Sequence, residues 1–424
     1  MPDLRPPGQD RGKRALDLLN FFLANVQTGF GPFVAVYLTA HKWTEGDIGL
    51  MLSVGTIVGV ASQLPAGALV DATTAKRAAT ATAIGGIMAA ALLLALWPVA
   101  LGVMAAEVLH GIASSVLTPA IAALSLRLVG RAALGERLGR NAAFGAVGNG
   151  LAAAAMGAAG STLGTRAVFW LTAALGVPAL AAVALLPRQA VRRADAPPEA
   201  TGPAAAPEAP RAAAPFRTSI VALLSDRRLL IFAAALVLFF LANAEVLPLA
   251  ASLMTRQAGT RASLIIAAAI VLPQAVVALT SGWVGREAER RGRRPLLVLG
   301  WTILPLPGVL LALLPTPAVL LAGQALGGVS AAVIGVMLPL TAADLTRESG
   351  HFNLCIGLFG LCAAGGATLG TALGGALADM AGNRVAFLCL AAIGLAGAAL
   401  LATFMPETRA ATPAGRVDPR EAPE

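Results

Sequence analysis

Long apolar runs recur along the whole chain of 424 residues. Windows of about 20 mainly apolar residues, separated by Pro, Gly and charged clusters, are typical of transmembrane helices. The pattern predicts six helices in each half of the chain. The first six are expected at 15–40, 46–70, 77–97, 99–126, 141–163 and 166–187. The second six are expected at 229–254, 262–285, 295–314, 317–343, 352–378 and 384–405.

Composition supports an all-α integral membrane protein. Apolar residues make up 57% of the chain and charged residues only 12%, whereas soluble domains have roughly 25% charged residues. So few charges cannot cover a water-exposed surface, which excludes a soluble globular protein. Cys355, Cys362 and Cys389 all lie in apolar runs and form neither a disulfide framework nor a metal motif. We therefore expect no metal and no cofactor.

The distribution of positive charge predicts the orientation in the membrane. Of the 31 Lys and Arg residues, all but Lys42, Arg166, Arg256, Arg261 and Arg384 fall in the tails and in the loops on the same side as the tails. Cytoplasmic loops are enriched in Lys and Arg, so both termini are expected in the cytoplasm. Topology thus explains the net charge of +9, and nucleic acid is not an expected partner. We expect a multi-pass protein of the inner (plasma) membrane.

The chain divides at a Pro- and Ala-rich segment, which predicts a disordered cytoplasmic linker between two six-helix bundles. Residues 21–25 (FFLAN) recur 218 positions later as residues 239–243. Arg166 and Arg384 are related by the same offset, which indicates an internal duplication, a common architecture of transporters. The predicted units are a first bundle (1–187), the linker (188–217), a second bundle (218–406) and a cytoplasmic tail (407–424).

Two loops at corresponding places in the halves carry a similar set of residues. The second-half copy consists of Gly285, Glu289, Arg290, Gly292, Arg293 and Arg294, and the first-half copy of Gly67, Asp71, Lys76 and Arg77. Both resemble the signature loop of the major facilitator superfamily, and the duplicated twelve-helix pattern extends this resemblance over the whole chain. The resemblance implies a gate in which the acidic residue lies near a helix end of the neighbouring bundle and the basic residues pair across the halves. Alternatively, these Lys and Arg residues only set the topology.

Few ionisable groups lie deep in the predicted spans. Such groups cost several kcal/mol in a bilayer, so each is a candidate functional residue. With a rise of 1.5 Å per residue, Glu107, Glu245 and Gln324 lie about 10–14 Å from the outer ends of their helices. In the family that the chain resembles, the first, fourth, seventh and tenth helices line the central cavity. The predicted substrate and proton cavity comprises Glu107, His110, Glu245, Asn25, Gln27, Asn243 and Gln324.

No Lys or Arg is predicted deep in a span, so the two buried acids need a proton or a cation. Alternatively, Glu107 and His110, one helical turn apart, simply satisfy each other. In drug-exporting members of the family the fourth helix carries R-x-x-Q-G. The corresponding stretch here reads Glu107-x-x-His110-Gly111, so a carboxylate stands where those members have Arg.

These features predict a secondary transporter that uses alternating access. We expect a monomer that is coupled to protons and exports a cationic or amphipathic small molecule. An importer or facilitator of a small metabolite is the alternative. A pump is disfavoured because no lysine lies in an ATP-binding loop motif, and an embedded enzyme because no nucleophile–base pair or metal motif is present.

Overall fold

The computed structural model describes residues 7–30, 32–43, 45–187, 223–258, 262–347 and 349–409. Helices are the regular elements in these ranges. Twelve helical stretches among the described residues are long and apolar enough to cross a membrane. This confirms the prediction of an all-α protein with many spans. The predicted linker at 188–217 lies outside the described residues, as does nearly all of the predicted tail.

The helices follow one another with short connections. The first half contains α1 (Pro7–Thr28), α2 (Pro32–Ala40), α3 (Glu45–Ala72), α4 (Lys76–Leu96), α5 (Ala100–Val129), α6 (Leu134–Leu163) and α7 (Arg166–Leu185). The second half contains α10 (Arg227–Asn243), α11 (Val246–Ala258), α12 (Ala262–Arg291), α13 (Arg294–Ile303), α14 (Leu306–Leu313), α15 (Pro317–Leu345), α16 (Phe352–Ala381) and α17 (Asn383–Phe404).

Two spans extend further than predicted. α6 begins at Leu134 rather than at 141, and α12 continues to Arg291 rather than ending at 285. The predicted loop residues from Gly285 to Arg290 therefore form the last turns of a helix. Hydropathy marks where the apolar stretch ends, whereas a helix can continue beyond it with solvated charges.

Three spans are interrupted. The first breaks between α1 and α2, and Pro32 begins the new helix, where its missing N–H costs nothing. The seventh breaks at Ala244 and Glu245, between α10 and α11. The ninth breaks around Pro305, between α13 and α14. These breaks divide spans that the apolar pattern alone predicts as continuous.

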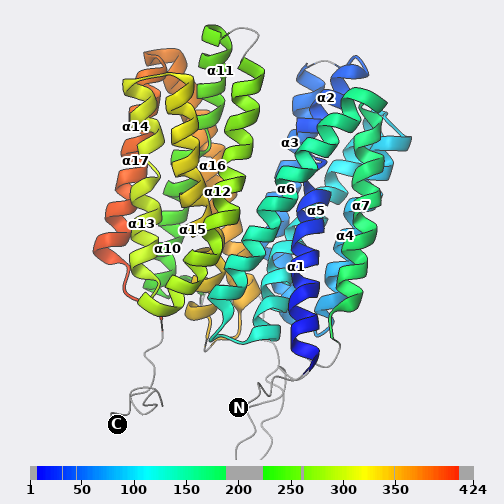
Figure 1. The fold of residues 1–424 in the computed structure, drawn as a ribbon, viewed down its shortest axis with the longest axis vertical. Coiled ribbons are helices and arrows are strands. Elements are labelled where there is room, and N and C mark those ends of the chain that lie inside the picture. Colours follow the sequence, from blue (N-terminus) through cyan, green and yellow to red (C-terminus); the bar gives the residue numbers. More distant parts are fainter. Residues whose placement is uncertain are drawn as a thin grey trace, which may run out of the picture.

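The helices form two bundles that meet near the end where both termini lie and diverge towards the opposite end (Figure 1). Between the halves, α3 packs on α16 and α6 packs on α12. The main apolar core of the second half, which includes Trp301 and Phe359, extends into the first half to Leu134 and Leu138. The halves are therefore joined by buried apolar contacts at the terminus end.

Glycines let the helices of the two halves approach closely. A Cβ at Gly67 of α3 would collide with the carbonyl oxygen of Asn353 at the start of α16. Likewise, a Cβ at Gly285 of α12 would collide with the carbonyl oxygen of Gly135 at the start of α6. Small residues allow such close packing in membrane proteins. Both partners of the second contact are related to those of the first by the 218-residue offset seen in the sequence, so the duplication includes the contact between the halves.

Candidate functional site

Asp71, at the end of α3, caps the first turn of α16 in the other half. One of its carboxylate oxygens accepts hydrogen bonds from the Asn353 backbone N–H at 3.0 Å and the Asn353 side chain at 2.6 Å. The other accepts one from the Leu354 N–H at 2.8 Å. These backbone groups have no partner within their own helix, and the helix N-terminus favours a negative charge. Asp71 therefore fastens the two halves together.

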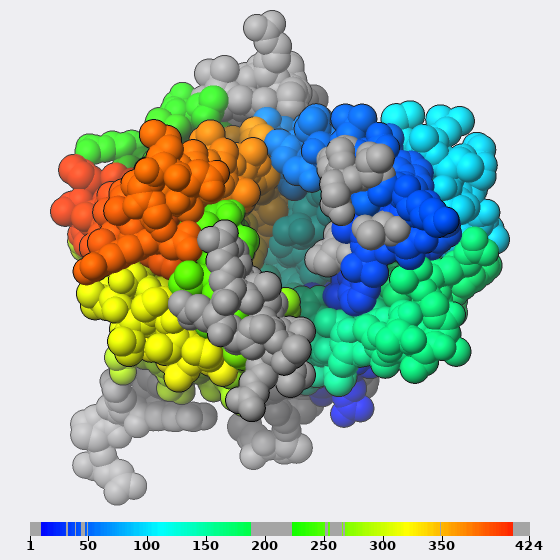
Figure 2. Space-filling model, turned by 90° about the horizontal axis from the view of Figure 1, so that it is seen from above, coloured from blue at the N-terminus to red at the C-terminus, as the bar shows by residue number. Residues whose placement is uncertain are grey.

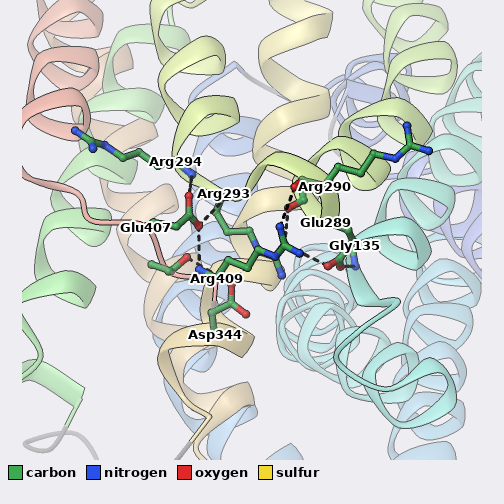
Figure 3. A network of polar contacts seen from close by, with 10 residues as sticks. Gly135, Glu289, Arg290, Arg293, Arg294, Asp344, Glu407 and Arg409 are labelled. Atoms are coloured by element: carbon green, nitrogen blue, oxygen red, sulfur yellow. Dashed lines mark hydrogen bonds and ion pairs between the residues drawn. The ribbon is translucent and has the colours of Figure 1, made fainter. Parts of the chain in front are cut away.

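Glu289 makes the corresponding contact from the second half. Its carboxylate accepts a hydrogen bond of 2.7 Å from the Gly135 backbone N–H in the first turn of α6 (Figure 3). Asp71 and Glu289 are related by the 218-residue offset. Each of the two acids therefore lies beside a helix end of the opposite bundle.

A third polar contact crosses the halves at the same end. Arg131, in the turn between α5 and α6, donates to the Ala343 carbonyl in the last turn of α15. This cation lies at the C-terminal end of a helix, where positive charge is favoured. Nothing in the sequence singles out Arg131 among the four Arg residues of its region. We call the contacts of Asp71, Glu289 and Arg131 across the halves the terminus-side lock.

The basic pair of the second loop, Arg293 and Arg294, holds its own half together. Arg293 donates to Asp344 at 2.9 Å, to the Ala288 carbonyl at 2.6 Å and to Glu289 at 3.3 Å. Arg294 donates to the Ala402 carbonyl at 2.6 Å. The expected pairing of these residues across the halves is therefore wrong. The reason is that the chain turns sharply at Gly292, whose φ is +94°, so that both side chains point back into the second half.

The first loop follows the same scheme. The Lys76 ammonium is buried and donates to the Val70 and Thr73 carbonyls at 2.6 and 3.2 Å, which closes the end of α3. Arg77 donates to the Val183 and Ala184 carbonyls at the end of α7, as Arg294 does at the end of α17. Arg77 and Arg294 thus each bind the end of the last helix of their own half.

A residue after the last helix completes this arrangement. The Glu407 carboxylate accepts hydrogen bonds from the backbone N–H groups of Arg293, Arg294 and Arg409 at 2.8, 3.1 and 2.9 Å (Figure 3). Arg409 also donates to the Arg290 carbonyl at 2.8 Å. Burial acts to raise the pKa of Glu407, but these N–H groups and the Arg293 charge outweigh it and leave the pKa below its ordinary value.

A cavity of about 500 Å³ lies between the two halves. Its walls come from α1, α5 and α6 on one side and from α10, α12 and α15 on the other. The lining is largely apolar, with amide groups from Asn20, Gln27, Asn141, Asn149 and Gln274. Seen from the end away from the termini, the molecule is hollowed between the halves (Figure 2).

A second, more polar cavity of about 660 Å³ lies within the first half. It is formed by α1, α3 and α5, and Gln27 and Thr118 line both cavities. Its other polar residues are Thr56, Gln63, Glu107, His110, Ser114 and Ser115. Among the described residues, neither cavity is lined by a Lys or Arg. The two cavities together offer an apolar compartment beside a polar compartment that contains an acid.

Glu107 and His110 both line the polar cavity, but they do not satisfy each other. Glu107 is only 5% exposed, and its Oε1 has no hydrogen-bond partner among the described residues. The His110 ring stacks instead on Phe30, with ring centroids 3.8 Å apart and nearly parallel planes. Phe30 occupies the break between α1 and α2. A buried carboxylate with an unpaired oxygen is costly unless it binds a proton or a cation.

The other predicted cavity residues do not gather around Glu107. Gln27 reaches both cavities, but the Asn25 amide donates to the Phe21 carbonyl of its own helix. Asn243 is exposed, and Gln324 lines neither cavity. Glu245 sits at the break of the seventh span and faces α16. The predicted layer of polar groups from three helices is therefore divided between different parts of the molecule.

A buried ionic cluster in the first half was not foreseen. Asp17 of α1 accepts hydrogen bonds from Arg137 and Arg140 of α6. Arg137 also donates to Asn141 at 2.8 Å, and Asn141 donates to Ser125 of α5 at 2.8 Å. The prediction placed both arginines in a loop because it began the fifth span at 141. The cluster ties α1, α5 and α6 together directly behind the Gly135 contact. Within the described residues, no group of three or more His, Cys, Asp or Glu side chains is placed to hold a metal ion.

Comparisons with known proteins agree with this fold. The model of the Major Facilitator Superfamily matches residues 16–285 and 241–422. An uncharacterised MFS-type transporter of Mycobacterium tuberculosis, from strains CDC 1551 / Oshkosh and H37Rv, is 36% identical over 399 residues, which cover 94% of each chain. The chain therefore belongs to the major facilitator superfamily. It is a multi-pass membrane transporter and not an enzyme.

Solved structures share the same architecture. The human organic anion transporter MFSD10 (TETRAN) matches with a TM-score of 0.69 and 16% identity, over 94% of this chain and 100% of that one. The proton:xylose symporter XylE, bound to 6-bromo-6-deoxy-D-glucose, matches with a TM-score of 0.68 and 13% identity, over 95% of this chain and 97% of that one. These likenesses establish the shared fold.

Proposed function

We propose that this transporter exports a cationic, amphipathic small molecule in exchange for protons, and that Glu107 is the group for which the two compete. The observation that carries the proposal is the buried, unpaired carboxylate oxygen of Glu107 in a cavity without a lining Lys or Arg. An anion in this position requires a positive partner. Either a proton or the cationic head of a substrate can supply it.

The two adjoining cavities support the choice of substrate class. An organic cation that places its charged head beside Glu107 would extend its apolar body past Gln27 and Thr118 into the cavity between the halves. That cavity is lined by Leu23, Phe240 and other apolar side chains. Ligand sites commonly combine such apolar walls with a few polar groups that fix orientation. An anionic substrate would meet repulsion from Glu107 and no compensating cation in the lining.

The terminus-side lock supports alternating access. The halves are joined at the end that carries the termini and diverge at the other end (Figure 1). With the termini in the cytoplasm, as the charge distribution predicts, this arrangement corresponds to a state that opens outward. Release of the bonds made by Asp71, Glu289 and Arg131 would then accompany the opposite, inward-open state.

A binding experiment tests the substrate class. We expect ethidium, an amphipathic cation, to raise the melting temperature of the purified protein more at about pH 8 than at about pH 6, because the buried, unpaired carboxylate of Glu107 is more fully occupied by a proton at the lower pH. Glu107→Gln should lose this stabilisation, whereas Asp226→Asn, which alters a surface acid paired with Arg228, should keep it. Equal stabilisation by the anion cholate or the neutral sugar xylose would refute the proposed class, as would full retention in Glu107→Gln.

A further inference from the structure

Glu245 is a second buried acid, in the other half of the molecule from Glu107. It is 9% exposed, and its Oε2 has no hydrogen-bond partner among the described residues. Thr371 lies one helical turn before Gly374 of α16, the glycine against which the Glu245 side chain packs. Among the described residues, no Lys, Arg or His forms an ion pair with it; the helices α16 and α17 carry Asp379 and Arg384. Glu245 lines neither of the two cavities described above.

The Glu245 side chain packs against the last of three glycines spaced four residues apart on α16, and we call this position the Gly374 seat. A Cβ at Gly366 would collide with the Val237 carbonyl of α10, and a Cβ at Gly370 with the Leu241 carbonyl one turn later. At the next turn, a Cβ at Gly374 would stand 2.6 Å from Cγ of Glu245. The first two glycines thus admit the backbone of α10, and the third admits the side chain of Glu245.

The duplication shows that this seat belongs to the second half alone. At the 218-residue offset, Gly366 corresponds to Gly148, which also packs against α1. Gly374, however, corresponds to Met156, and Glu245 corresponds to Gln27. The first half therefore has neither the acid nor the space for it at this position. Helix packing common to both halves does not account for Glu245.

We propose that Glu245 is a separate proton-binding site that holds the seventh span in its broken form. The neutral acid can stay in the Gly374 seat, whereas the carboxylate with its unpaired oxygen has to reach water. Because Glu245 lies in the break between α10 and α11, its departure from the seat moves the start of α11. The transporter thus has two protonation sites, one in each half. This inference rests on the proposed proton coupling but names a different group from Glu107.

Infrared difference spectroscopy of the purified protein at neutral pH tests the two sites independently. The C=O stretch of a protonated carboxylic acid is resolved from the bands of carboxylates. We expect Glu245→Gln to remove one such band and Glu107→Gln to remove another. Asp226→Asn should remove none, because the pKa of Asp226 is lowered: burial acts to raise it, but the hydrogen bonds and charge of Arg228 outweigh this effect.

A second variant keeps the test valid if Glu245→Gln does not fold. Thr371→Val removes a hydroxyl one helical turn from the Gly374 contact of Glu245, and it should shift the frequency of the Glu245 band without changing that of Glu107. Spectra of Glu245→Gln, or of Thr371→Val, that match the wild type in the acid region would overturn the Glu245 site. If only Glu107→Gln leaves the acid region of the spectrum unchanged, the coupling role of Glu107 is refuted and the Glu245 site stands.

Discussion

Asp71 should hold the terminus-side lock more strongly than any other single residue. Its carboxylate accepts three hydrogen bonds from α16, whereas Glu289 accepts one from α6. Asp71→Asn removes the charge and points an amide N–H₂ at a backbone N–H. At least one charge-assisted bond, worth about 1.5–3 kcal/mol, is lost, together with about 0.3–1 kcal/mol of helix-end electrostatics. A total of about 3 kcal/mol changes the ratio of locked to open protein roughly 100-fold.

Glu289→Gln weakens only one bond between the halves, that from Gly135, because the ion pair of Glu289 with Arg293 lies within the second half. Its expected cost is about 1.5 kcal/mol, or roughly a 10-fold change in the same ratio. The prediction is therefore an order of effects as well as a direction. Both substitutions should increase the population that is open at the terminus end, and Asp71→Asn should increase it more.

Distances between spin labels on the two halves measure this population. Labels at Thr74 and Ser349, both exposed and on either side of the Asp71 contact, should give a longer distance component in Asp71→Asn, in a background with the three cysteines replaced by alanine. Asp226→Asn is the matched control, because Asp226 caps α10 within its own half through the Arg228 N–H at 2.8 Å. An unchanged distance distribution in Asp71→Asn, or a larger shift in Asp226→Asn, would refute the lock.

Three further predictions concern other parts of the chain. Glu407→Gln should lower the stability of the purified protein by about 1–2 kcal/mol at neutral pH. Because the pKa of Glu407 is lowered in the folded protein, the difference from the wild type in thermal unfolding should vanish as the pH falls below the ordinary glutamate range. A difference that stays constant with pH would contradict the capping role. Gly285→Ala should cost about 1–3 kcal/mol and shift the spin-label distances as Asp71→Asn does, whereas Gly365→Ala, where a Cβ meets nothing within 4 Å, should be harmless. Deleting ten residues within 188–217 should leave transport in vesicles intact if this segment is the flexible linker that its composition predicts, and lost transport would contradict that prediction.

The sequence was sufficient to predict the architecture because lipid requires long apolar helices, and these are visible in composition alone. The duplication was visible because identical residues recur at one offset. Helix ends were less predictable, since α12 continues through charged residues to Arg291 where hydropathy indicates a loop. That difference turned a predicted gating loop into a helix end. In the same way, α6 begins at Leu134 rather than at 141, which hid the contacts of Arg137 with Asp17.

The site was predicted only in part. Glu107 and His110 were identified because ionisable groups in a span are rare, and both line one cavity. Helix number and depth do not specify which way a side chain points, and so they placed Glu245 in the same layer as Glu107. Its position against Gly374 depends on the rotation of α10 against α16. The stacking of Phe30 on His110 likewise depends on a helix break that the apolar pattern does not reveal.

Ethidium flux in proteoliposomes with an imposed pH gradient tests most directly whether Glu107 couples protons to transport. Wild-type protein should accumulate ethidium against its concentration gradient, in the direction opposite to proton flow. Glu107→Gln should lose this gradient-driven accumulation, and Asp226→Asn, which changes an acid outside the cavities, should retain it. Accumulation by Glu107→Gln at the wild-type rate and with the wild-type pH dependence would contradict the account, because the unpaired carboxylate would then have no part in coupling.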